Sequence, residues 1–302
     1  MTIKEWFIVW FKAARAPFLV VSFLPSVLGG MVAWYYDSAG FNWTVFIVAT
    51  VGIVMAHSAA DFIDDYFDFL KGNLGNKEKQ FHDSPLIDGK VTLKQVAVAT
   101  AICLVIAFAA GIYLLINVGM PVIWMTLAGA FIVFFYTSPP VKLNYRGLGE
   151  TALFFAFGPL ITFGVFYVIT GQLSLEAFMI GIVSGIFTMN VGLVSNTFDY
   201  EDDVVSGKKC IPVRFGQKNA VRVLGTVSVL AYLVQIGGVI AGLMPWWTLI
   251  VLVTIPLAYK IIQATSLYSD RSNYTKAMTK AIALASLSSI ILTIGYLLEV
   301  VV

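Results

Sequence analysis

Long apolar segments recur along the whole chain, and each is close to the ~20 residues that a helix needs to cross a membrane. Nine such segments cover residues 16–36, 44–70, 96–116, 121–139, 151–169, 175–198, 220–243, 247–267 and 279–302. Hydrophobic residues make up 59% of the sequence and charged residues only 12%, whereas soluble domains carry ~25% charged residues. The sequence therefore predicts an all-α integral membrane protein with nine transmembrane helices.

The basic residues support this count, because they are confined to alternate connections between the predicted helices. One set of connections, starting with the N-terminus and counted together with the adjoining ends of the helices, carries all 19 Lys and Arg residues, and the other set carries none. Loops rich in Lys and Arg remain in the cytoplasm. We therefore expect a multi-pass protein of the cell membrane, with a cytoplasmic N-terminus and two long cytoplasmic loops, residues 71–95 and 199–219.

The layout of the helices suggests an internal organisation. Acidic segments end the second and the sixth predicted helix, four spans apart, which favours two four-helix units followed by a final helix. We expect residues 1–302 to form a single transmembrane domain. Residues 1–15 mix Trp and Phe with Lys and Arg, a composition typical of a short helix at the membrane interface.

Two clusters of carboxylates stand at the cytoplasmic ends of these two helices. They are Asp61, Asp64, Asp65 and Asp68 in the first and Asp199 and Asp203 in the second. The spacing in the first cluster places its members on one helix face. Carboxylates so close together repel one another, and burying them unpaired is costly. Because Mg²⁺ prefers oxygen ligands and bridges carboxylates to phosphate oxygens, the clusters predict a site for a Mg²⁺-bound phosphate or diphosphate.

The sixth predicted helix indicates where its carboxylates point. Gly181, Gly185 and Gly192 share a helix face with Asn196 and Asp199. Small residues let membrane helices approach one another closely. We therefore expect this face, and the second acidic cluster with it, to point into the bundle.

These motifs resemble those of the UbiA superfamily of intramembrane aromatic prenyltransferases, and the resemblance covers nearly the whole chain. The first family motif, Asn-Asp-x-x-Asp-x-x-x-Asp, falls on residues 64–72, where Asp64 replaces the leading Asn and Gly72 the final Asp. The variant Asp-Tyr-x-Asp-x-x-Lys-Gly at residues 65–72 is similar to the menaquinone-pathway branch. The second motif, Asp-x-x-x-Asp, is intact at Asp199 and Asp203.

Two further stretches carry the resemblance, and one departs from it. Residues 136–149 match the loop that follows the fourth helix of the family, and residues 15–17 approximate its Arg-Pro pair near the first helix. Ser84 stands where many members have an Arg. One phosphate-binding cation is therefore missing there, or Lys79 or Lys90 supplies it.

The resemblance implies a UbiA-type fold and Mg²⁺-dependent transfer of a prenyl group from a polyprenyl diphosphate to an aromatic acceptor. The favoured acceptor is 1,4-dihydroxy-2-naphthoate, in menaquinone synthesis. It implies that Asp64, Asp68, Asp199 and Asp203 are the catalytic residues and hold the metal. The residues expected to bind substrate are Arg15, Asp61, Asp65, Lys71, Tyr136, Ser138, Lys142, Tyr145, Arg146, Asn196 and Lys208. The expected partners are the donor, an aromatic or lipid-like acceptor and membrane lipid, with no nucleic acid.

Other interpretations of the same residues remain open at this point. The acceptor could be the hydroxyl of geranylgeranylglyceryl phosphate, in archaeal lipid synthesis. Intramembrane acids also line ion paths, so a cation-coupled transporter is an alternative, although these carboxylates stand at helix ends rather than at mid-membrane. A third alternative is a lipid-binding homologue without catalytic activity. His57, one turn before the first cluster, is a buried packing residue or a proton acceptor.

Overall fold

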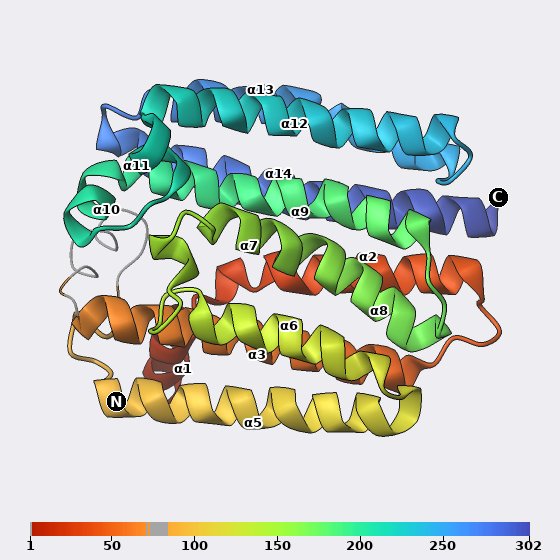
Figure 1. Cartoon of the computed structure of the whole chain (residues 1–302), viewed down its shortest axis with the longest axis horizontal. Helices are drawn as coiled ribbons and strands as arrows, with labels where there is room; N and C mark the ends of the chain where they lie inside the picture. Colours follow the sequence, from red (N-terminus) through yellow and green to blue (C-terminus); the bar gives the residue numbers. More distant parts are fainter. Residues whose placement is uncertain (1, 71, 73–83) are drawn as a thin grey trace.

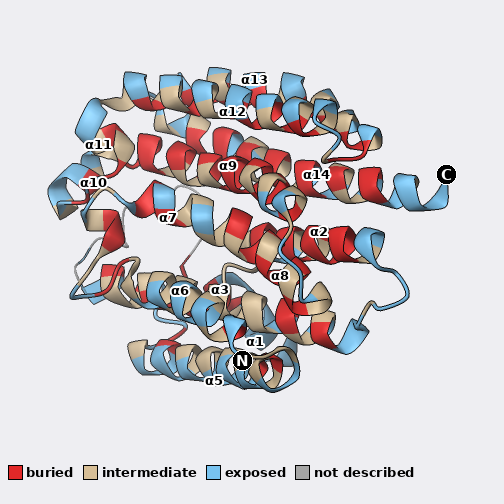
Figure 2. Ribbon diagram, turned by 45° about the vertical axis from the view of Figure 1, so that its right-hand side comes forward, coloured by how far each residue is buried: buried red, intermediate tan, exposed pale blue. Residues whose placement is uncertain are grey.

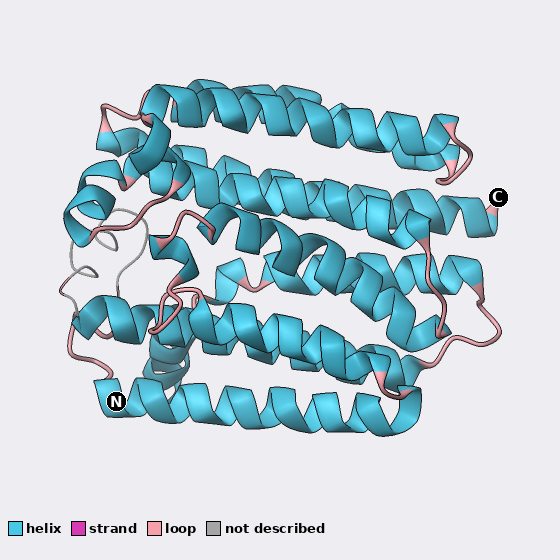
Figure 3. Cartoon of the chain, viewed as in Figure 1, coloured by secondary structure: helices cyan, strands magenta, loops and turns pink. Residues whose placement is uncertain are grey.

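The computed structural model describes residues 2–70, 72 and 84–302, and this part of the chain forms helices and connecting loops (Figure 3). The first half contains α1 (Ile3–Ala13), η1 (Ala16–Phe18), α2 (Val20–Tyr36), α3 (Trp43–Leu70), α5 (Leu93–Val118), α6 (Pro121–Phe135) and η2 (Leu143–Tyr145). The second half contains α7 (Gly149–Phe155), η3 (Ala156–Leu160), α8 (Ile161–Thr170), α9 (Leu175–Phe198), α10 (Tyr200–Ser206), α11 (Ile211–Phe215), α12 (Gln217–Ile240), η4 (Trp246–Thr254), α13 (Ile255–Thr265), η5 (Arg271–Asn273) and α14 (Tyr274–Val301).

The long helices lie side by side and connect two ends of the molecule (Figure 1). The short helices α10 and α11 lie at the left end in this view, and the C-terminus lies at the right end. This arrangement agrees with the alternation in the sequence of connections with and without Lys and Arg.

Eight helical stretches of the described chain are long and apolar enough to cross a membrane, which makes this a multi-pass membrane protein. The remaining apolar helix, α6, has 15 residues. At 1.5 Å per residue it is ~22 Å long, less than the ~30 Å of the hydrocarbon core. The sequence predicted a helix up to residue 139, but helices usually end before a proline, and Pro139 and Pro140 follow here. The count of nine transmembrane helices therefore stays a prediction.

A proline also shapes the segment that runs from α7 to α8. The helix is continuous in direction from Gly149 to Thr170, but its middle, η3, is a π-helical turn that contains Pro159. Proline lacks the backbone N–H that an α-helix needs, and a π-turn is a common way to absorb such a break. Here the turn brings the backbone of η3 against α9.

The glycine face of α9 points into the bundle, as predicted. A Cβ on Gly185 would lie 2.5 Å from the carbonyl oxygen of Phe154, and one on Gly158 would lie 2.4 Å from the carbonyl oxygen of Gly181. No larger residue fits at such a contact, so these glycines let the backbone of α9 touch the backbones of α7 and η3. Figure 2 shows the consequence: α9 is mostly buried, whereas α5 at the edge is mostly exposed.

Polar side chains inside the bundle are paired between helices. The amide Nδ2 of Asn190 on α9 donates to Ser228 Oγ on α12 at 2.9 Å, and Gln235 Nε2 on α12 donates to Thr248 Oγ1 on η4 at 2.6 Å. Such bonds hold membrane helices in register. The first of these bonds holds α9, which leads into the second acidic cluster, against α12.

Candidate active site

A cavity of about 730 Å³ lies inside the bundle, between α2, α3, α5, α6, α8, α9 and α14. The residues of α3 that line it are Ala49, Gly52, Ile53, Ala56, His57, Ala60, Asp61, Asp64 and Asp68. They recur every three or four positions and form one face of the helix. Three carboxylates of the first cluster therefore point into the cavity. Asp65 is buried but does not line it, so the predicted four-carboxylate face is divided.

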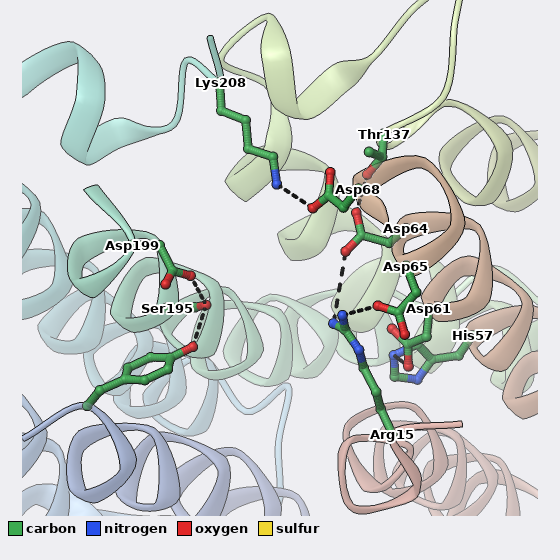
Figure 4. A network of polar contacts seen from close by, with 11 residues as sticks. Arg15, His57, Asp61, Asp64, Asp65, Asp68, Thr137, Ser195, Asp199 and Lys208 are labelled. Carbon is green, nitrogen blue, oxygen red and sulfur yellow. Dashed lines mark hydrogen bonds and ion pairs between the residues drawn. The ribbon is translucent and has the colours of Figure 1, made fainter. Parts of the chain in front are cut away.

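Arg15 explains where Asp65 points. Its guanidinium donates a hydrogen bond to Asp65 and lies 3.9 Å from Asp64 Oδ2 (Figure 4). Arg15 reaches this position from a left-handed turn between α1 and η1, with φ +47°. This conformation is uncommon for a residue with a side chain. The hydroxyl of Thr137, beyond the end of α6, donates to the other oxygen of Asp64.

Asp68 forms a buried ion pair across the cavity. Its Oδ2 accepts a hydrogen bond from Lys208 Nζ at 3.1 Å, and both side chains are almost fully buried (Figure 4). Burial alone would lower the pKa of Lys208, but the carboxylates of Asp68, Asp64 and Asp203 outweigh it and raise the pKa well above its ordinary value. Lys208 is therefore a fixed positive charge at the cavity wall.

The second cluster lies across the cavity from the first. Asp199 ends α9 and lines the cavity, and its Oδ2 accepts a hydrogen bond from Ser195 Oγ at 3.1 Å (Figure 4). The hydroxyls of Ser195 and Tyr274 lie 3.0 Å apart, which ties α9 to the start of α14. Asp203 on α10 is fully buried, and its Oδ2 accepts from Cys210 Sγ at 3.4 Å. It does not line the cavity in this structure.

Glu150 is a site residue that the sequence analysis missed. It is 2% exposed, and its Oε1 accepts from both Asn196 Nδ2 and the backbone N–H of Ile211, each at 2.9 Å. The side-chain amide of Asn196, which was expected to bind substrate, is therefore directed at Glu150. One carboxylate thus joins α7, α9 and α11, and it braces the connection that carries Lys208. The sequence signal that could have identified Glu150 is its position as an acidic residue directly before the apolar segment 151–169.

We predict that Glu150→Ala lowers kcat for prenyl transfer by ~10–100-fold, the usual cost of removing a group that orients a metal site. Glu150→Gln keeps an oxygen in the position of Oε1, so it should retain most of the activity. Steady-state rates of the two purified variants test this. Equal losses in both would mean that the charge of Glu150, rather than its two hydrogen bonds, is required.

The remaining predicted binding residues fall into two groups. Tyr136 and Asn196 line the cavity, as do Arg15, Asp61 and Lys208. Ser138, Lys142, Tyr145 and Arg146 are outside the lining. Among them, Ser138 donates to the Phe134 carbonyl, Arg146 donates to the Pro140 carbonyl at 3.3 Å, and Lys142 Nζ lies 5.7 Å from the Tyr145 ring centroid.

Two of the predicted cations cannot be placed. Lys71 and Lys79 lie outside the described residues. Lys90, the other proposed replacement for the missing Arg, has its Nζ 2.8 Å from Asp88 Oδ2 in an exposed pair. Ser84 itself is buried.

The histidine on the same face of α3 is part of a polar contact chain. His57 Nδ1 lies 2.9 Å from Ser22 Oγ on α2, and its Nε2 lies 3.7 Å from Asp61 Oδ2 (Figure 4). The ring packs edge-on against Phe157, with centroids 4.6 Å apart. His57 therefore marks the border between the polar end of the cavity and its apolar remainder.

The donor set fits Mg²⁺ held jointly by protein and substrate. Within the described part of the chain, no group of three or more His, Cys, Asp or Glu side chains could hold a metal ion by itself. Mg²⁺ typically binds one or two carboxylates and completes its shell with water and substrate phosphate. Asp68 Oδ1 is buried and has no hydrogen-bond partner among the described residues. Such an oxygen is costly to leave unmatched, and a divalent cation would satisfy it.

Comparisons with known proteins agree with this geometry. The pattern of the UbiA prenyltransferase family matches residues 23–290. A 2-carboxy-1,4-naphthoquinone phytyltransferase of Synechocystis sp. is 26% identical, over 95% of this chain and 92% of its own length. A 1,4-dihydroxy-2-naphthoate octaprenyltransferase of Bacillus subtilis is 23% identical, over 97% and 93%.

Solved structures share the fold. A UbiA homolog from Aeropyrum pernix superposes with a TM-score of 0.72, at 18% identity over 93% of this chain and 98% of that one. A UbiA homolog from Archaeoglobus fulgidus, bound to GPP and Mg²⁺, superposes with a TM-score of 0.60, at 13% identity over 97% and 99%.

Proposed function

Because the chain belongs to the UbiA prenyltransferase family, we propose that it transfers a prenyl group from a polyprenyl diphosphate to 1,4-dihydroxy-2-naphthoate. The two relatives described above are named for naphthoquinone and dihydroxynaphthoate acceptors, which supports this choice. The transfer depends on Mg²⁺ between the two acidic clusters. The solved relative with GPP and Mg²⁺ supports this requirement.

The amphipathic character of the cavity is the observation that carries the proposal. One end is lined by Asp64, Asp68 and Asp199 together with the cations Arg15 and Lys208. The rest is lined by apolar residues of α3, α5, α6 and α8. A prenyl diphosphate has the matching form, a charged head and a long apolar tail.

The residues at the polar end have distinct roles in this reaction. Asp64, Asp68 and Asp199 would hold Mg²⁺, and Asp203 is buried close to Lys208. When bound, Mg²⁺ would neutralise the charge of the diphosphate and so help the bond between C1 of the donor and the diphosphate oxygen to break. Arg15 and Lys208 add fixed positive charge where the leaving diphosphate gains negative charge.

The apolar wall of the cavity protects the allylic cation that remains after the diphosphate has left. It excludes water from the allylic cation, which can then be attacked only by the electron-rich ring of the acceptor. Tyr136 and Phe157 line the cavity, and aromatic faces attract cations. The new bond joins the C1 atom of the donor, whose bond to the diphosphate oxygen has broken, to a ring carbon of the acceptor. That ring carbon then loses the substituent it carried, a proton or its carboxyl group as carbon dioxide, and the ring becomes aromatic again.

The orientation in the membrane is part of the proposal. We place the N-terminus and the loops at 71–95 and 199–219 in the cytoplasm, because all basic residues lie on that side of the predicted topology. In α1, the exposed side chains Trp6, Phe7 and Phe11 alternate with charged residues. This composition supports a helix at the membrane interface, within one domain that spans residues 1–302.

A second candidate acceptor is geranylgeranylglyceryl phosphate, whose hydroxyl would replace the ring carbon. The observation in its favour is the likeness to a solved digeranylgeranylglyceryl phosphate synthase, with a TM-score of 0.58 over 97% of this chain and 98% of that one. The identity is 16%, so this likeness concerns the fold. A cation-coupled transporter is no longer favoured, because the chain belongs to a family of transferases.

The deciding experiment incubates the purified protein with Mg²⁺, radiolabelled geranylgeranyl diphosphate and each acceptor separately. We expect a prenylated naphthoate product and release of diphosphate. Product with geranylgeranylglyceryl phosphate alone would establish the second candidate instead. Substrate counterflow in proteoliposomes without any prenyl transfer would favour a transporter.

Removal of the metal should abolish this activity. We expect EDTA to reduce prenyl transfer to background, because the diphosphate then faces three carboxylates with only two protein cations beside it. Added Mg²⁺ should restore the rate, as a titration followed by product formation would show. Full activity after complete metal removal would contradict the proposed site.

A further inference from the structure

The cavity continues far beyond the carboxylates as an apolar arm. On α3 its lining extends from Asp64 to Ala49, about 15 residues or ~22 Å at 1.5 Å per residue. On α6 it extends from Tyr136, beside the residue that binds Asp64, to Val122, again ~20 Å. Two helices thus give the same depth independently.

A buried apolar cluster closes the far end of this arm. The residues that belong both to the cluster and to the cavity lining are Ala49, Leu114, Val122, Ile161, Val165 and Val168. They come from α3, α5, α6 and α8, whose ends lie together at the right of Figure 1. We call these six residues the floor.

Two glycines keep the arm open, one above the floor and one among the floor residues of α8. A Cβ on Gly129 would lie 3.8 Å from Leu160 Cδ2, and one on Gly164 would lie 3.8 Å from Met125 Sδ. Both are ordinary van der Waals contacts, so the backbone does not exclude a larger side chain at either position. Since both glycines line the cavity, such a side chain would occupy the arm itself.

We propose that the depth of this arm sets the donor chain length, and that Gly129, Gly164 and the floor determine the specificity. The proposal rests on prenyl transfer as the proposed function. An extended residue has three bonds along the chain and spans ~3.3–3.6 Å. An isoprene unit has four bonds along the chain, so in extended form it spans about four thirds of that length, ~4.6 Å. The arm of ~20–22 Å then accepts the four units of a geranylgeranyl chain, which span ~18 Å in extended form, but not the eight units of an octaprenyl chain, which span ~37 Å.

The glycines lie at different depths and therefore make a graded test. Gly129 is about seven residues above Val122 on α6, so a side chain there would shorten the arm by ~10 Å. Gly164 lies among the floor residues of α8, and a side chain there would shorten the arm by less. Gly237 is a matched control, because it is exposed on α12, outside the cavity, with no atom within 4 Å of an added Cβ.

The experiment measures kcat/KM for geranyl, geranylgeranyl and octaprenyl diphosphate in the wild type and in Gly129→Leu, Gly164→Leu, Val122→Ala and Gly237→Leu. We expect the wild type to prefer geranylgeranyl diphosphate. In Gly129→Leu, kcat/KM with geranylgeranyl diphosphate should fall ~10–200-fold, the usual effect of a poor fit in an apolar pocket. Its kcat/KM with geranyl diphosphate should stay unchanged. Gly164→Leu should act in the same direction but less, Val122→Ala should raise the relative use of the longest donor, and Gly237→Leu should match the wild type.

Several results would overturn the inference. One is equal use of octaprenyl and geranylgeranyl diphosphate by the wild type. Another is an unchanged donor profile in Gly164→Leu and Val122→Ala, which decides the matter even where Gly129→Leu fails to fold. If the wild type transfers no prenyl group from any donor, the proposed function fails instead. Thermal stabilisation of the same variants by each diphosphate then tests the arm without turnover.

Discussion

Asp68→Ala and Asp199→Ala should each abolish prenyl transfer while the protein still inserts into the membrane. The two carboxylates line the same cavity, Asp68 from α3 and Asp199 from the end of α9. Each substitution therefore removes one side of the proposed metal site. Loss of a single group that stabilises developing charge typically costs ~10²–10³-fold in kcat, and loss of a metal ligand should cost at least as much. Product formation by the purified variants, at saturating donor and Mg²⁺, measures the effect.

Controls separate this loss from misfolding. Asp199→Asn keeps the volume of the side chain and an oxygen that can accept from Ser195 Oγ, so it should fold as the wild type does and remain inactive. Asp68→Asn should also be inactive but less stable, because it leaves the buried charge of Lys208 without its partner. Asp88→Ala removes a carboxylate from an exposed ion pair with Lys90 and should leave the rate unchanged. Wild-type turnover in Asp68→Asn or in Asp199→Ala would remove the basis for a shared diphosphate site.

Much of the fold could be predicted because membrane helices follow simple physical rules. Apolar length and the one-sided distribution of basic residues located the spans, and the helical period showed that Asp61, Asp64 and Asp68 share a face. The glycines of α9 likewise indicated which side of that helix points inward. These signals are local, since each depends on residues within one helix.

The contacts that complete the site are not local. Lys208 and Asp68 are 140 residues apart in sequence, and Glu150 reaches Asn196 and Ile211 across 46 and 61 residues. Periodicity shows which way a side chain points but not what lies opposite it. The same reason explains why Asp65, which belongs to the acidic cluster by spacing, is directed at Arg15 instead.

The pair of Lys208 and Lys209 allows a sharp test of the buried charge network. Lys208 is buried against Asp68, whereas Lys209, the next residue, is exposed. Breaking a buried ion pair by removing one partner typically costs ~3–5 kcal/mol, because the remaining charge stays buried. Surface substitutions usually change stability by less than ~0.5 kcal/mol. Lys208→Met should therefore lower the free energy of unfolding strongly, and Lys209→Met should not.

Activity and stability should separate in a second variant. Lys208→Met combined with Asp68→Asn removes both charges of this pair, so it should recover part of the stability lost in Lys208→Met. It should remain inactive, because it lacks both a predicted metal ligand and a cation for the leaving diphosphate. Thermal unfolding in detergent, followed by tryptophan fluorescence, and product formation measure the two properties on the same samples. Equal stability of Lys208→Met and Lys209→Met would show that the pair with Asp68 does not stabilise the folded bundle.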